Sequence, residues 1–404
     1  MTQVIDADSR LDLAGVIVRR EADDEYVVGD PATGDFIVVP EAGARLVELL
    51  AAGSSVAAAA AELERETGEA IDAADFAAAL VEAGIARPAA DPAATAVRDE
   101  ARHWAVSRIP SWLVRPFFGP VAWAAYVACL VATLVMFGLE PSLRPTYEDT
   151  FVFPDIVLSL LVTNVVVILL TFLHEAWHAF AGAAVGIPSR LRLERRGIFP
   201  VLETDLSGLW ALPPAKRYGP FLAGMAIDSV VLFLAVAPRY AWSRGWIDLS
   251  PMLIRILAMV VLSQVAKLAF QTLAYLRTDM YLVMSTATGC GNLHQVTRLS
   301  LKRLVRRLKP EEQTVLDTAA ARDLRVARWY RLLYVAGLIW MVWFAIHFIV
   351  PSAKVTFGWA FGVIAQAPVL SLYWWEGLIL LAFTSLNVFL PVGVAIRNRR
   401  RAAR

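Results

Sequence analysis

Cysteine and histidine are both scarce in this chain. Its 404 residues include two cysteines, Cys129 and Cys290, and five histidines. Two cysteines cannot form a disulfide framework or a cysteine-based metal site. Histidines are also few, yet residues 171–180, TFLHEAWHAF, place two of them and a glutamate near the end of a long apolar run. That placement needs an explanation.

Net charge is also nearly absent. Lys and Arg number 38 and Asp and Glu number 37, so the net charge of +1 gives no support for a general affinity for nucleic acid. The first residues, MTQVIDADSRLDLAG, contain no apolar core long enough for a signal peptide. We therefore expect no nucleic-acid partner, and we expect the N-terminal region to stay in the cytosol.

Apolar residues make up 58% of the chain, and most of them lie beyond residue 118. There the chain alternates between apolar blocks and Arg-rich connections. Such blocks are typical of membrane-spanning helices. The segment 352–371 is rich in Gly and aromatic residues, and we expect a loop there, with a re-entrant segment as the alternative. The blocks predict about six spans: 119–139, 155–184, 219–238, 252–276, 331–351 and 372–396.

Lys and Arg are concentrated in alternate connections between these spans. The connection 186–218 carries six, 277–330 carries ten, and the tail RNRRRAAR carries five. The connections 140–154 and 352–371 carry one each. By the positive-inside rule, the basic segments and both termini lie in the cytosol. The lipid bilayer is thus an expected partner of a multi-pass protein.

His174 and His178 are four residues apart, so on a helix they share one face. Both imidazoles can reach one zinc ion, and Glu175 can take a proton from the activated water and pass it to a leaving amine. This is the H-E-x-x-H arrangement of zinc peptidases. The alternative is a pair of polar residues that make helix contacts, although ionisable groups inside spans are usually functional.

Two histidines need a third protein ligand, with a fourth position left for water. Asp279, in YLRTDMYLVM, fits best because the topology puts it at the end of the fourth span, level with His178. Glu203 and His294 are the alternatives, and Asp205 lies beside Glu203 in the chain.

Four other titratable residues lie in or near the spans. Asp228 and Lys267 fall inside the third and fourth spans, and we expect them to pair with each other in a structural role. His347 lies near the far end of the fifth span, out of reach of the histidine pair. His103 precedes the first span.

The pentapeptide HEAWH at 174–178, with Asp279 about a hundred residues later, resembles the site-2 protease family of intramembrane zinc peptidases. The second motif of that family is N-x-x-P-x-x-x-x-D-G, and its Asp is the third zinc ligand. Aligned on Asp279, the Asn falls on Gln271, the Pro on Ala274 and the Gly on Met280. The stretch DMYLVMSTATGCGNL looks like the version found in the multi-pass, peptide-maturing branch.

This resemblance implies a role for each matching residue. His174, His178 and Asp279 would hold zinc, and Glu175 would activate water. Gln271 would offer its amide to the substrate backbone.

Residues 1–87 are expected to form a separate soluble domain. EYVVGDPATGDFIVV predicts a hairpin, and helices are expected at about 41–51, 55–67 and 72–83. A hairpin followed by three helices is an α+β, winged-helix-like plan. Residues 88–118 would then be a linker and juxtamembrane segment, and residues 119–404 the membrane domain.

The spacing of Tyr26, Asp30, Gly34 and Pro40, with the closing ALVEAGIA, resembles the peptide-chaperone domain of pyrroloquinoline quinone biosynthesis. This is the recognition element of ribosomally made, modified peptides. In that family a leader peptide joins the sheet edge as an extra strand and also contacts the third helix. The alternative is a winged helix that binds DNA or a partner protein, although the acidity of this region disfavours DNA.

Together these features predict a mainly α, polytopic zinc metalloprotease of the bacterial plasma membrane. Its N-terminal domain would capture the leader of a ribosomally made, modified precursor peptide, which the membrane domain would cleave. The precursor and other enzymes of a peptide-modification pathway are the expected partners. The competing hypothesis is a non-hydrolytic transporter or immunity protein for a modified peptide. A third possibility is a family member that binds peptide without cutting it.

Overall fold

The chain is mostly helical, and its strands are confined to two small regions. The computed structural model describes residues 5–22, 25–30, 35–68, 71–88, 104–105, 109–187, 189–196, 199–382 and 384–385. Within these ranges some residues are described by their backbone only: 22, 35, 104, 105, 190–196, 199–203, 274 and 311.

The N-terminal unit combines a three-stranded antiparallel sheet with three helices. The expected hairpin and helices are confirmed, whereas the first strand of the sheet was not predicted. The turn at 31–34 lies outside the described residues. The strands pair in the order β2 (Ile17–Ala22), β3 (Glu25–Asp30) and β4 (Asp35–Pro40), and α1 (Glu41–Ala51), α2 (Val56–Thr67) and α3 (Ala73–Glu82) follow. Two short strands, β1 (Leu11–Asp12) and β5 (Arg87–Pro88), pair with each other.

Local signals explain why these helices begin where they do. The side chains of Ser55 and Asp72 each accept a hydrogen bond from a backbone N–H in the first turn of α2 and α3. Such caps satisfy N–H groups that the helix itself leaves unpaired. The sheet and the three helices enclose one apolar core around Val28, Leu46 and Leu80.

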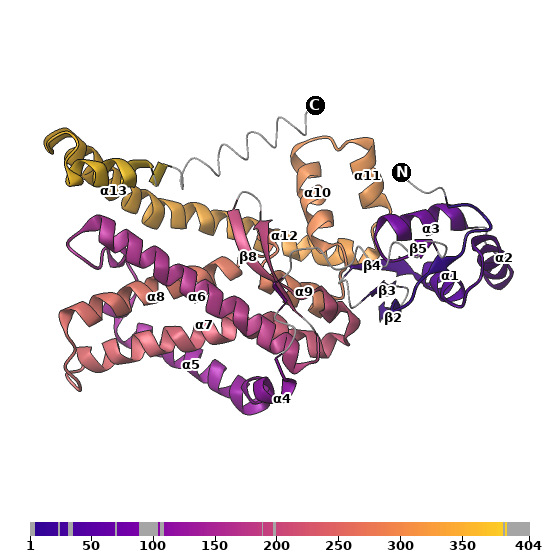
Figure 1. Cartoon of the computed structure of the whole chain (residues 1–404), viewed down its shortest axis with the longest axis horizontal. Helices are drawn as coiled ribbons and strands as arrows, with labels where there is room; N and C mark the ends of the chain where they lie inside the picture. Colours follow the sequence, from indigo (N-terminus) through magenta and orange to yellow (C-terminus); the bar gives the residue numbers. More distant parts are fainter. Residues whose placement is uncertain are drawn as a thin grey trace.

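Five helices are long and apolar enough to cross a membrane, and four of them match predicted spans. By the length and composition of these helices, the chain is a polytopic helical membrane protein. Figure 1 shows α5 to α8 lying side by side, and α7 is the most buried of the five. The four matching helices are α5 (Pro120–Leu139), α6 (Ile156–Ala184), α7 (Pro214–Ser243) and α8 (Pro251–Gln271).

The expected loop at 352–371 is wrong, because most of this segment is helical. Helices α12 (Ala321–Phe344) and α13 (Val350–Gln366) join through a π-helical turn, η8 (Ala345–Ile349), into one run of 46 residues. Pro351 would clash with the carbonyl of a regular preceding turn, and the wider π turn directly before it accommodates the ring. Of the expected sixth span, Leu372–Ala382 is an apolar helix, and most of the remainder lies outside the described residues.

A second small sheet lies beside the end of α6. It contains β6 (Trp104–Ala105), β7 (Arg190–Arg196) and β8 (Phe199–Asp205), all antiparallel. Strand β8 leads through η6 (Ser207–Ala211) into α7, and Figure 1 shows β8 lying across α6. Part of the basic connection 186–218 thus forms a hairpin next to α6.

The segment before the first span packs against the same helix. It forms α4 (Ser111–Val114) and η3 (Arg115–Phe118). The ring of Phe117 lies 5.7 Å from that of Trp177, and Trp177 Nε1 donates a hydrogen bond to Tyr126 on α5. These contacts hold the part of α6 that carries both histidines.

The N-terminal unit is joined to the membrane helices by a buried ion pair. Arg217, at the start of α7, is fully buried and donates two hydrogen bonds of 2.6 Å to the carboxylate of Glu21 on β2. Its remaining donors reach the carbonyls of Leu212 and Trp210, and its guanidinium lies 4.7 Å from the Trp210 ring. Val27 of β3 is also almost fully buried, although it does not belong to the N-terminal core.

We predict that Glu21→Gln loosens this attachment. Arg217 would keep its burial but lose its counterion, and breaking a buried pair costs about 3–5 kcal/mol. Hydrogen exchange should become faster in β2, η6 and the first turn of α7. Glu62→Gln is the matched control, because Glu62 pairs with Arg65 on the exposed surface of α2. Equal exchange in the Glu21 variant and the wild type would show that the pair does not hold the unit in place.

Candidate metal centre

Helix α6 carries two buried histidines on one face. His174 and His178 are each 3% exposed, and their ring centroids are 4.8 Å apart. The Asp155 side chain caps the start of the helix, which continues without a break from Ile156 to Ala184. The spacing of four residues therefore brings both imidazoles to the same place.

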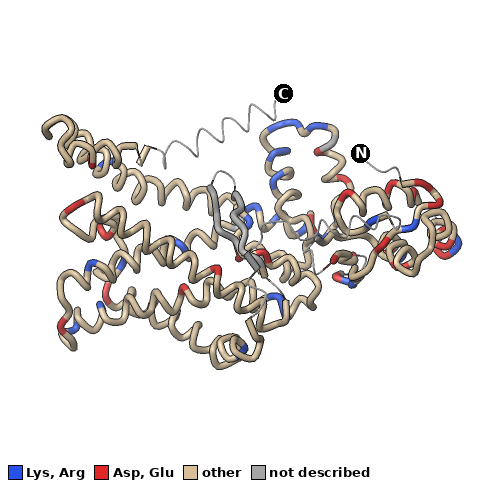
Figure 2. The backbone as a smooth tube through the Cα atoms, viewed as in Figure 1, with Lys and Arg blue, Asp and Glu red and all other residues tan. Residues whose placement is uncertain are grey.

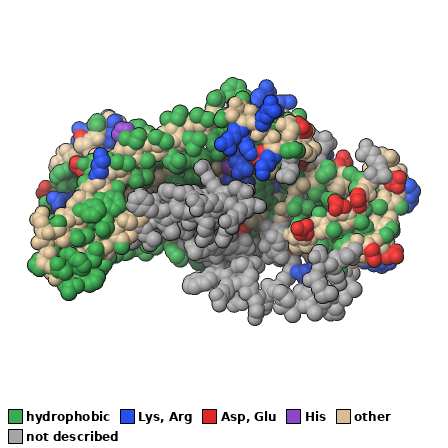
Figure 3. Space-filling view, turned by 90° about the horizontal axis from the view of Figure 1, so that it is seen from above, with side chains coloured by type: hydrophobic (Ala, Val, Ile, Leu, Met, Phe, Trp, Pro, Cys, Tyr) green, Lys and Arg blue, Asp and Glu red, His purple; other side chains and the backbone are tan. Residues whose placement is uncertain are grey.

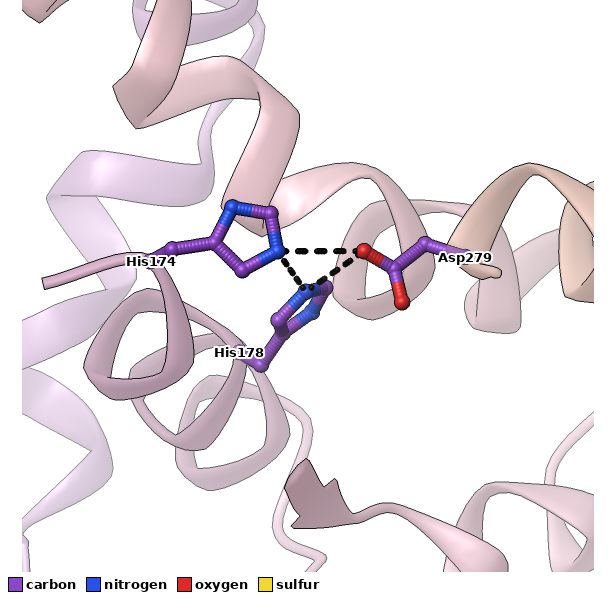
Figure 4. Close-up of side chains that lie close together, drawn as sticks. All are labelled: His174, His178 and Asp279. Carbon is purple, nitrogen blue, oxygen red and sulfur yellow. Dashed lines mark hydrogen bonds and ion pairs between the residues drawn. The ribbon is translucent and has the colours of Figure 1, made fainter. Parts of the chain in front are cut away.

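Asp279 completes a group of three. It is the first residue of α9 (Asp279–Thr288), a short helix that follows α8 (Pro251–Gln271), so it lies at the end of the predicted fourth span, as expected. Its Oδ2 atom is 3.1 Å from Nε2 of His174 and 3.1 Å from Nε2 of His178. The two Nε2 atoms are 3.2 Å apart. Figure 4 shows the three side chains pointing toward one another.

Hydrogen bonds at Nδ1 of each imidazole determine its tautomer, and so which nitrogen offers a lone pair to the group of three. His174 Nδ1 is 2.7 Å from Oδ2 of Asp228, and His178 Nδ1 is 2.7 Å from the Pro220 carbonyl. Both partners are acceptors, so each Nδ1 carries the proton and each Nε2 presents a lone pair. Two imidazole lone pairs and a carboxylate oxygen thus converge on one point. Such a set of acceptors could bind a shared cation.

The size of the triangle indicates which ions fit. Around a tetrahedral ion with bonds of about 2.0–2.1 Å, neighbouring ligand atoms are about 3.3–3.4 Å apart. The observed edges of 3.1–3.2 Å are only slightly shorter. Calcium forms bonds of about 2.3–2.6 Å to oxygen ligands, so its ligand atoms would have to lie farther apart than these three. The group can therefore hold a metal ion of small radius.

The expected pair of Asp228 and Lys267 is confirmed, and it also supports the histidine. Lys267 Nζ lies 3.2 Å from Oδ1 of Asp228, while the other oxygen of Asp228 contacts His174. Lys267 also donates to the carbonyl of Leu170, one turn before His174 on α6. The lysine thus fixes the carboxylate that orients the imidazole.

Glu175 lies next to His174 on α6 and is 9% exposed. Its Oε2 accepts a 2.8 Å hydrogen bond from the backbone N–H of Thr204, and the Thr204 hydroxyl donates to the Glu175 carbonyl. The H-E-x-x-H pattern predicts a glutamate at the rim of the site. In the structure Glu175 is instead buried against β8, and the Thr204 N–H holds one of its carboxylate oxygens.

Gln271, the last residue of α8, lies at the edge of the group. Its Oε1 accepts from the backbone N–H of Asp279 at 3.1 Å, which places its amide nitrogen 3.3 Å from His174 Nε2. A second bond, from the Thr278 hydroxyl to the Gln271 carbonyl, closes the turn between α8 and α9. Gln271 therefore positions the aspartate and directs an N–H donor toward the centre.

Gly224 on α7 allows this helix to approach the imidazoles closely. A Cβ atom at this position would lie 2.4 Å from the His174 ring and 2.5 Å from His178 Nε2. No side chain fits such a space without moving a ring. No pattern around Gly224 in the sequence predicts this role.

The alternative ligands lie elsewhere or are not described. Asp205 accepts two hydrogen bonds from Ser207 at the start of η6. His294 packs against Tyr281 and Tyr334, and burial together with nearby Arg side chains lowers its pKa to about 4. His347 stacks on Trp343 at an exposed position. The side chain of Glu203 and all of His103 lie outside the described residues.

Comparison of the chain with protein-family models, curated proteins and solved structures found no match. What this centre can do therefore follows from its own residues.

We predict that Gly224→Ala weakens metal binding about 10–100-fold, the range seen when ligand orientation is disturbed. The added methyl group must displace at least one imidazole. Gly219→Ala, on the same helix, is the matched control because its Cβ would meet its nearest neighbour at 3.8 Å. Titration of the metal-free proteins with zinc measures the difference. Equal affinities in the two variants would contradict the close approach.

Proposed function

We propose that this protein is a zinc metalloprotease of the bacterial plasma membrane that cleaves a ribosomally made, modified precursor peptide. The observation that carries the proposal is the convergence of His174, His178 and Asp279, with Glu175 directly after the first ligand. Three protein ligands are the number typical of catalytic zinc sites, whereas structural sites use four.

Zinc is the ion that best suits these ligands. Two imidazoles and one carboxylate are common zinc ligands, and the spacing of the three atoms suits bonds near 2 Å. A bound zinc ion would polarise a peptide carbonyl and lower the pKa of water.

The protein's own groups would supply the proton transfers. Glu175 would accept a proton from the attacking water and deliver it to the leaving amine. Because the N–H of Thr204 occupies Oε2, the other oxygen of the carboxylate is the better base. Gln271 would donate its amide hydrogen to the substrate carbonyl, and its own bond to the Asp279 backbone keeps that amide in place. The fixed orientation of these groups would avoid reorganisation during the reaction.

The basic connections would face the cytosol, and both termini with them. His174 and His178 lie in the later part of α6, close to the end that leads into β7. The centre would therefore be reached from the cytosolic side, where water is available.

The N-terminal unit would serve as a winged-helix-like domain that captures the leader. Strand β4 is an outer strand of its sheet, so a leader can add beside it. Val39 of β4 and Phe76 of α3 both lie next to Gly43, which places α3 near this edge. The ion pair between Glu21 and Arg217 would hold the captured peptide near the centre and raise its local concentration there.

We predict that Glu175→Gln retains about one zinc per chain but loses cleavage of a co-expressed precursor. Removal of a general base costs about 10²–10⁴-fold in rate. Metal analysis and mass spectrometry of the precursor measure the two effects.

Two further variants act as controls for that experiment. His174→Ala should lose the metal, whereas His347→Ala should retain both metal and cleavage because His347 lies at an exposed position away from the group. Cleavage at the wild-type rate by Glu175→Gln would remove this residue from the mechanism. Freshly purified wild-type protein without metal would favour a transporter or immunity protein instead.

We also predict that the full-length protein binds the leader of a precursor encoded beside its own gene. Ala79 is exposed on α3, one turn from Phe76, so Ala79→Glu should weaken binding roughly ten-fold by placing a charge at the docking edge. Ala61→Glu makes the same change on the exposed face of α2 and should leave binding unaltered. Fluorescence anisotropy of a labelled leader measures both. Equal binding of a scrambled leader would rule out specific recognition.

A further inference from the structure

The hairpin formed by α10 (Leu293–Val305) and α11 (Pro310–Asp317) plays no part in the metal centre. In Figure 1 it projects upward, across the horizontal direction in which α5 to α8 run. A segment that runs across the spans extends along the membrane plane rather than away from it.

The base of the hairpin fixes its depth relative to the membrane. Leu293, Val296 and Leu299 of α10 pack with Ala327 and Tyr330 of α12. The apolar part of α12 begins directly after this level, with LLYVAGLIWMVWF at 332–344.

The residues of α12 at the same level are those of a membrane–water boundary. Arg328 and Arg331 flank Trp329, which is 74% exposed. Trp and Arg at the end of an apolar helix are typical of the interface. The hairpin therefore lies at the membrane surface.

The tip of the hairpin is strongly basic. Arg303, Arg306 and Arg307 are exposed, and none of them forms an ion pair with another described residue. Lys302, one turn below, is already paired with Glu312. Figure 2 shows Lys and Arg positions along the backbone at this end of the hairpin, and Figure 3 shows a cluster of Lys and Arg side chains on this face of the molecule.

The same tip exposes two large apolar side chains and an open groove. Leu304 is 70% exposed and Val305 is 84% exposed. The groove measures about 510 Å³ and is lined by residues 303–308 and Gln313. Guanidinium groups and aliphatic side chains thus alternate along one short stretch.

We propose that this tip binds the headgroups of anionic phospholipids in the leaflet that it faces. A guanidinium donates two parallel hydrogen bonds to a phosphate, and a cluster of basic residues beside a span attracts anionic lipid. Leu304 and Val305 enter the acyl boundary between the headgroups. An acidic peptide would satisfy the arginines, but it would leave unexplained why these apolar residues are exposed at the level where the apolar part of α12 begins.

The test is native mass spectrometry of the full-length protein from micelles that contain equal amounts of phosphatidylglycerol and phosphatidylcholine. The wild type should retain phosphatidylglycerol in several-fold excess. The triple variant Arg303→Gln, Arg306→Gln and Arg307→Gln should lose most of this excess, so that the two lipids are retained in nearly equal amounts. The corresponding triple change to Lys keeps the charge and should retain most of it.

The matched control removes three exposed arginines at the opposite end of the bundle, by Arg144→Gln, Arg244→Gln and Arg255→Gln. It should keep the excess of phosphatidylglycerol. The proposal is overturned if the tip variant binds phosphatidylglycerol as the wild type does, or if the control loses as much as the tip variant. It is also overturned if an acidic peptide, rather than lipid, protects the tip from hydrogen exchange.

Discussion

Mutual repulsion among three lone pairs is the constraint on which this structure depends. Two imidazole nitrogens and a carboxylate oxygen are held 3.1–3.2 Å apart inside a bundle of apolar helices. Without support these three side chains would move apart, so the residues around them must hold them in place. Asp228 and the Pro220 carbonyl fix the rings, and Gln271 fixes the aspartate backbone. Each support comes from a different turn of α7 or from the end of α8.

Helix α7 connects the parts of the molecule. Arg217, Pro220, Gly224 and Asp228 follow one another at spacings of three, four and four residues, so they lie on one face of the helix. Arg217 holds the N-terminal unit, Pro220 and Asp228 orient the two histidines, and Gly224 makes room for both rings. A shift or rotation of this single helix would move the contacts of the N-terminal unit and of the candidate metal centre together.

Local patterns predicted much of this arrangement, and tertiary contacts account for the rest. The histidine pair could be read from sequence because both residues lie on one helix, and Asp279 followed from span order and the resemblance of its motif. The Asp228–Lys267 pair was expected because charges inside spans seek partners. Thr204 and Gly224 carried no comparable signal, since their roles depend on which strand or helix lies opposite. The loop expected at 352–371 was wrong because its Gly and aromatic residues were given too much weight over the continuous apolar run around them.

Lys267 has a consequence for electrical balance. Around the centre, Asp228, Glu175 and Asp279 contribute one formal negative charge each, and Lys267 contributes one positive charge. The resulting formal charge of −2 matches that of a divalent cation in the candidate metal centre. An uncompensated charge is very costly in a medium of low permittivity. The charge of Lys267 therefore determines how much positive charge a bound cation must supply to make the site neutral. Without Lys267, neutrality of the same group of residues would require a trivalent ion, or a divalent ion together with an additional proton.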